Sequence, residues 1–108
     1  MLLTVAAPAA AHSLLLDASP AANSVVTAVP REVALRFNNR IEKRLSRITV
    51  LDEGGRARAL AIAVTDGGAD RLTAAVPALA PGAYRVEWHV LSTDGHVVSG
   101  AFGFRLAR

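Results

Sequence analysis

The chain has 108 residues and a net charge of +3, and 52% of its residues are hydrophobic. This length suits one domain, and the composition is that of a globular protein rather than a disordered one. The chain has no cysteine, which excludes disulfides, thiolate zinc sites, iron–sulfur clusters and blue-copper sites. No apolar run reaches the roughly 18 residues that span a bilayer, so a membrane-spanning protein is not expected.

The first eleven residues, MLLTVAAPAAA, are apolar and uncharged. The last three of them fit the A-x-A pattern after which signal peptidase cleaves, although the basic residues that begin a complete signal are missing. We therefore predict that residues 1–11 are the remnant of a signal peptide and that residues 12–108 form one exported domain. Cleavage after Ala11 would make His12 the new N-terminus.

The rest of the chain shows short strands separated by turns, without a convincing helix. Apolar and other side chains alternate after Pro30, as expected for a strand with one buried face, and similar runs follow at regular intervals. Residues 39–47 contain only Ile41 and Leu45 as apolar residues, and we expect them to connect two sheets. The predicted buried faces in this part of the chain are Val33/Leu35/Phe37, Ile48/Val50, Leu60/Ile62/Val64 and Leu72/Ala74/Val76.

The clearest pattern lies in the last third of the chain. Pro81 and Gly82 open a strand whose even positions are large and apolar and whose odd positions are polar. A final strand places phenylalanine and leucine on one face. Together, about seven such segments without a crossover helix predict an all-β fold, an antiparallel two-sheet sandwich of immunoglobulin-like architecture or a Greek-key barrel. The even positions of the two strands are Tyr84, Val86, Trp88, Val90, Phe102, Phe104 and Leu106.

Two of the three histidines lie near this pattern. His89 is on the polar face of the strand that contains Trp88, and we expect no role for it. Asp94 and His96 lie between the last two strands, and their spacing puts both side chains on one side of an extended segment, about 6–7 Å apart. A carboxylate and an imidazole that converge could form a partial metal site or an acid–base pair. The alternative is an aspartate that bonds the backbone of its own turn.

The predicted N-terminus favours the metal site. An N-terminal histidine offers two ligands, its α-amine and a ring nitrogen. Together with Asp94 and His96, His12 would supply three nitrogens and one oxygen, which suits a tetragonal Cu(II) ion better than tetrahedral zinc. The amine must lose its proton to bind, so the affinity should weaken as the pH falls. If Ala11 stays attached, the amine becomes a peptide nitrogen and this chelate is lost.

Positive charge gathers at one place in the sequence. Nucleic-acid-binding proteins usually combine a basic stripe with aromatic residues for stacking, but the five aromatic residues here have core-like spacings, so no nucleic acid is expected. We interpret the cluster as a solvated positive face, and a docking patch for an acidic partner is the alternative. The cluster consists of Arg36, Arg40, Lys43, Arg44 and Arg47.

With these residues in view, the sequence resembles the CopC family of periplasmic copper-binding proteins. The resemblance runs from Ala11 to Leu106 and includes the alanine–histidine pair at the predicted cleavage point. Its most specific part is PGAYRVEW at residues 81–88, followed by STDGH at residues 92–96 and by FGF at residues 102–104.

The resemblance implies a cupredoxin-like Greek-key barrel that binds one Cu(II) ion through His12, Asp94 and His96. It also implies copper handling in the periplasm, or otherwise outside the cytoplasmic membrane, often alongside a CopD-like inner-membrane protein that imports copper. Some relatives bind Cu(I) through a methionine-rich loop, but this chain has no methionine after Met1, so a Cu(I) site is disfavoured. Relatives often have a glutamate near the copper where this chain has Asn39.

We therefore predict a monomeric, non-catalytic protein that sequesters, buffers or delivers Cu(II) in copper resistance and homeostasis. The alternative is a structural or interaction domain of immunoglobulin-like architecture without metal. An oxidative copper enzyme that cleaves polysaccharides ranks lower, because Tyr84 and Trp88 occupy a core-like face rather than an exposed one. A hydrolase ranks lower still, because Ser92 and Ser99 lack the context of a nucleophile elbow.

Overall fold

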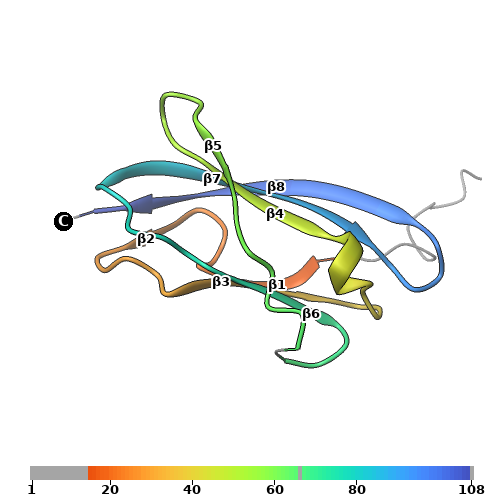
Figure 1. Cartoon of the computed structure of the whole chain (residues 1–108). Helices are drawn as coiled ribbons and strands as arrows, with labels where there is room; N and C mark the ends of the chain where they lie inside the picture. The colour runs from red at the N-terminus through yellow and green to blue at the C-terminus, as the bar shows by residue number, and fades with distance from the viewer. Residues whose placement is uncertain (1–14, 66, 108) are drawn as a thin grey trace, which may run out of the picture.

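The computed structural model describes residues 15–65 and 67–107, and strands make up most of it (Figure 1). A three-stranded sheet has the order β1-β3-β6, and a five-stranded sheet has the order β2-β8-β7-β4-β5. Among the described residues, no helix is long and apolar enough to cross a membrane. The elements are β1 (Leu15–Ser19), β2 (Ser24–Val26), β3 (Glu32–Phe37), the 3₁₀ turn η2 (Lys43–Leu45), β4 (Arg47–Leu51), β5 (Ala57–Ala59), β6 (Arg71–Ala75), β7 (Gly82–Leu91) and β8 (Val97–Leu106).

The two sheets stack as a sandwich, which confirms the predicted all-β fold class. Neighbouring strands are antiparallel, except that β2 runs parallel to β8, with Ser24 opposite Phe104. The pattern did not predict this parallel pair. It arises because the chain leaves the first sheet after β1 and joins the edge of the second sheet beside a strand of the same direction.

The connection between β3 and β4 agrees with the prediction that residues 39–47 link two sheets.

The predicted strand through Leu60, Ile62 and Val64 is wrong. β5 ends at Ala59, and Ile62 forms only an isolated bridge with Ala74 of the other sheet. The chain crosses between the sheets at this point, so Leu60 is buried without belonging to a strand.

The core lies between the sheets and contains the inward faces predicted for β3, β4, β6, β7 and β8. In β3, β4 and β8 the buried residues alternate with exposed or half-buried ones, as the pleat of a strand requires. In β6 three consecutive residues are buried, Leu72, Thr73 and Ala74. Burial of this apolar surface supplies the main favourable free energy of folding. The core residues are Val33, Leu35, Phe37, Ile41, Ile48, Val50, Leu60, Leu72, Ala74, Val86, Val90, Phe102 and Phe104.

Trp88 packs against this core and also lies close to the neighbouring strand β8. It is opposite Gly100, where an added Cβ atom would be 2.2 Å from Cζ2 of the indole. The centroid of the indole is 6.5 Å from that of the Phe37 ring and 6.0 Å from that of Phe102. Glycine is therefore favoured at position 100, because the indole occupies the space that a side chain would fill.

Candidate metal centre

The turn between β7 and β8 contains the predicted pair Asp94 and His96. Two backbone hydrogen bonds close it, from the Ser92 amide to the His96 carbonyl at 2.9 Å and from the Gly95 amide to the Ser92 carbonyl at 2.9 Å. Gly95 has a φ of +92°, a conformation that side chains rarely adopt. The glycine between the two predicted ligands is therefore what allows the chain to turn sharply there.

Asp94 lies at the centre of the hydrogen bonds in this turn. Its Oδ1 accepts hydrogen bonds from the Ser92 hydroxyl and, at 3.1 Å, from the His96 amide. The same oxygen lies 3.1 Å from Nδ1 of His96. The aspartate therefore bonds the backbone of its own turn, as the alternative interpretation expected, and the same turn brings it together with the imidazole. Their side chains are closer than an extended segment would place them.

These contacts hold Asp94 in its charged form. The Ser92 hydroxyl, followed by the His96 amide, lowers the pKa of the Asp94 carboxyl from 3.8 to about 2. Hydrogen bonds donated to a carboxylate favour the ionised form. Asp94 therefore carries a negative charge at any pH at which the protein would meet a metal ion, and its side chain remains exposed to solvent.

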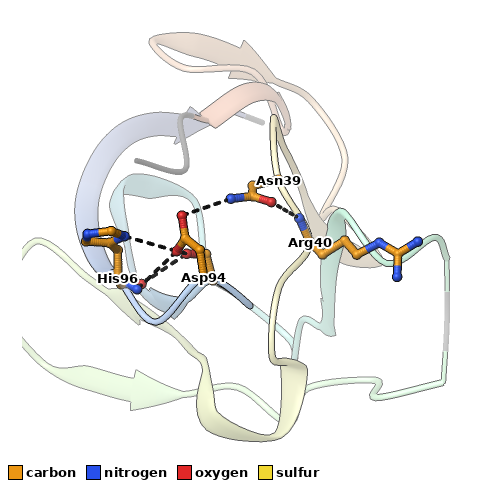
Figure 2. A network of polar contacts seen from close by, with 5 residues as sticks. Asn39, Arg40, Asp94 and His96 are labelled. Carbon is orange, nitrogen blue, oxygen red and sulfur yellow. Dashed lines mark hydrogen bonds and ion pairs between the residues drawn. The ribbon is translucent and has the colours of Figure 1, made fainter. Parts of the chain in front are cut away.

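Asn39 joins the site from the connection between the sheets (Figure 2). Its Nδ2 donates to Oδ2 of Asp94 at 3.4 Å, and its Oδ1 accepts a hydrogen bond from the Arg40 amide at 2.9 Å. The second bond fixes the side-chain amide so that its NH₂ group faces the carboxylate. From the sequence, the family resemblance indicated only that relatives often have a glutamate at this position, and the contact between the amide and Asp94 was not predicted.

Further bonds attach this connection to the turn. The Thr93 amide donates to the Arg40 carbonyl at 3.0 Å, and Ile41 forms a bridge with Ser92. The Ser92 side chain is buried, with 1% exposed, and its contact with Asp94 was not predicted from the sequence. The site is thus assembled from two segments that are held together by their backbones.

The other predicted site residues lie elsewhere. His12 and the predicted signal remnant at residues 1–11 lie outside the described residues. His89 is on the outer face of β7, where its Nδ1 lies 2.8 Å from the Ser99 hydroxyl. Within the described ranges, no group of three or more His, Cys, Asp or Glu side chains could hold a metal ion. Asp94 and His96 therefore need at least one further ligand to form a metal centre.

Known proteins are similar to this chain over most of its length. The family model described as the CopC domain matches residues 15–107. The chain belongs to the CopC family. CopC from Methylosinus trichosporium OB3b is a solved structure that is 39% identical, with a TM-score of 0.78, and the match covers 88% of this chain and 93% of that one.

Two other proteins are also similar to this chain. PcoC from Escherichia coli, described as a methionine-rich copper resistance protein, is 25% identical with a TM-score of 0.74, covering 90% of this chain and all of PcoC (100%). Protein YobA from Escherichia coli strain K12 is 33% identical over 97 residues, covering 87% of this chain and 77% of YobA. The present chain is not methionine-rich, since Met1 is its one methionine.

Proposed function

We propose that this CopC-family chain binds one Cu(II) ion and sequesters, buffers or delivers copper outside the cytoplasmic membrane, without catalysis. The observation that carries the proposal is the pair of Asp94 and His96, which lie 3.1 Å apart in the turn between β7 and β8 of a CopC domain. The similarity to PcoC, a copper resistance protein, supports a copper-related role.

The proposed ligands are the α-amine and ring of His12, the ring of His96 and the carboxylate of Asp94. Oδ2 of Asp94 is the oxygen that would face the metal, because Oδ1 already accepts two hydrogen bonds within the turn. Oδ2 accepts the long hydrogen bond from Asn39, at 3.4 Å. Nitrogen ligands together with one hard oxygen favour Cu(II) over Cu(I), which prefers sulfur.

The position of β1 supports a contribution from His12. Leu15, the first described residue, pairs with Phe37 at the end of β3, and Phe37 is two residues before Asn39. Three further residues of extended chain span at most about 10–11 Å. Leu15 thus lies on β1, which is the neighbour of β3, and β3 leads directly into the segment that contains Asn39. His12 is three residues before Leu15, so this reach is the distance over which it could approach the site.

The proposal includes processing and location. We propose that residues 1–11 are removed after Ala11, that residues 12–108 are the mature domain, and that it acts in the periplasm or another exported compartment. A CopD-like protein of the inner membrane would then be a candidate to receive the copper. Removal of the leader is essential, because only a free N-terminal amine completes the chelate.

Titration with Cu(II) tests the proposal. The protein that begins at His12 should bind one equivalent tightly, with an electron paramagnetic resonance spectrum typical of a tetragonal, nitrogen-rich site. The His96→Ala variant should lose this spectrum. His89→Ala is the matched control, since it removes a histidine from the outer face of the sheet, and it should bind like the wild type. No tight equivalent in the wild type would reject the copper function in favour of a metal-free structural domain. The same spectrum in His96→Ala would reject the proposed ligand set, because the copper would then be bound without His96.

A further inference from the structure

Positive charge is concentrated beside the candidate metal centre. The connection from Arg40 to Arg47 contains four cations and one carboxylate, Glu42, so its net charge equals the +3 of the whole chain. We call its cations Arg40, Lys43, Arg44 and Arg47 the basic rim. In the part of the chain that the structure describes, none of the three arginines of the rim forms an ion pair. Their charge is therefore not neutralised by neighbouring carboxylates.

The basic rim is fixed in place against the turn that contains Asp94 and His96. Besides the bonds of Arg40 and Ile41 described above, the Glu42 amide donates to the Leu91 carbonyl at 2.8 Å. The Leu91 amide in turn donates to the Ser46 hydroxyl at 3.1 Å. Figure 1 shows η2 and the β7–β8 turn at the same end of the sandwich, and in Figure 2 the Arg40 side chain extends away from Asp94.

Two exposed apolar side chains accompany the rim. Leu45 lies in η2 with 64% of its surface exposed, and Val97 directly follows His96 with 55% exposed. They belong to adjoining segments, because Val97 pairs with Leu91, which is bonded to Ser46. Apolar side chains flanked by arginine are typical of protein interfaces, where arginine is enriched and lysine is depleted.

We propose that the basic rim, with Leu45 and Val97, docks an acidic surface of a protein that exchanges copper with this chain. This inference rests on the proposed copper function, since it concerns the partner of that same site. Carboxylates are the complementary groups, because the guanidinium of arginine binds them through two parallel hydrogen bonds. Three of the four rim cations are arginine, which favours a protein surface over general attraction to an anionic membrane. Docking here would bring the partner to the turn that contains Asp94 and His96.

Peptide binding to the metal-free chain tests the docking surface separately from copper. The probe is a short dye-labelled peptide rich in glutamate, measured by fluorescence anisotropy at low salt, with the glutamine version of the same peptide as its control. The rim variant is Arg40→Gln/Arg44→Gln/Arg47→Gln. The matched variant is Arg31→Gln/Arg56→Gln/Arg105→Gln, which removes the same charge from exposed side chains towards the other end of the strands.

The glutamate peptide should bind the wild type and the matched variant alike, and bind the rim variant about tenfold more weakly. Raising the salt to physiological strength should weaken the binding, because the screening length is then about 8 Å. Equal losses in both variants would overturn the proposal, since net charge alone would explain them. Loss of binding to phosphatidylglycerol vesicles without loss of peptide binding would assign the rim to membranes and overturn it as well.

Copper titration of the same samples separates this proposal from the one on which it rests. A chain that distinguishes the two peptides but binds no Cu(II) would overturn the copper function and with it the exchange partner. A chain that binds Cu(II) but does not distinguish the peptides would overturn the docking surface alone.

Discussion

Replacing Gly100 with alanine should destabilise the fold through a single contact. The new Cβ would lie 2.2 Å from Cζ2 of Trp88 and 2.7 Å from Cε2 and Cη2. Carbon atoms in contact ordinarily stay about 3.5–4.0 Å apart, so the indole would have to move by more than about 1 Å. It cannot move freely, because it packs against the rings of Phe37 and Phe102.

The size of the effect follows from two opposing terms. Overpacking of this kind costs about 1–3 kcal/mol. Replacing glycine with alanine in a strand returns about 0.5–1 kcal/mol, because glycine loses more conformational entropy on folding. We therefore expect Gly100→Ala to lower the free energy of unfolding by about 1–2 kcal/mol, and the melting temperature by roughly 5–15 °C for a domain of this size.

Gly103→Ala on the same strand is the matched control. Its Cβ would meet only the Tyr84 carbonyl oxygen at 3.4 Å, which is an ordinary contact. Urea unfolding followed by circular dichroism should show Gly103→Ala close to the wild type and Gly100→Ala clearly less stable. Equal midpoints for the two variants would refute the inference that the indole fills the space at position 100.

Three further predictions concern the candidate site. Asp94→Asn should keep the turn, because the amide oxygen can still accept hydrogen bonds. It should lower the Cu(II) affinity by more than about tenfold, measured in competition with a chelator. An unchanged affinity would exclude Asp94 as a ligand. Asn39→Ala should weaken copper binding by about tenfold in the same assay, as typical for a group that orients a ligand, and should leave the urea midpoint nearly unchanged.

The third of these predictions concerns pH. The pKa of Asp94 is lowered to about 2, so its carboxylate stabilises the metal-free fold fully above pH 4, and this stabilisation is lost as the pH falls through 2. Copper release on mild acidification should therefore come from the nitrogen ligands. Ser92→Ala should raise the Asp94 pKa, measured by carboxyl carbon nuclear magnetic resonance, because the hydroxyl is the largest cause of the shift. An unshifted titration would contradict this assignment.

The strands with strong alternation could be predicted from the sequence, and those defined by distant pairing could not. The even and odd positions of β7 separate apolar from polar side chains, which specifies both the strand and its buried face. Residues 60–64 alternate in the same manner but cross between the sheets, so their burial has a tertiary cause. The parallel pairing of β2 likewise depends on which sheet edge is free beside β8.

The same division applies to the candidate site. Asp94 and His96 are two residues apart, so their approach is a local property of the turn and could be predicted. Asn39 is 55 residues from Asp94, and only the packing of the sheet connection against the turn brings them together. His12 remains a prediction, because it lies outside the described residues.

The five-stranded sheet is bounded on both sides by strands of only three residues, β2 and β5. An exposed sheet edge offers unpaired amides and carbonyls on which another chain can add a strand and begin to aggregate. Edges this short offer few such groups, and β5 also places the charge of Arg58 at its centre. The fold therefore limits strand addition at the borders of its larger sheet, which would favour a protein that stays dispersed at high concentration.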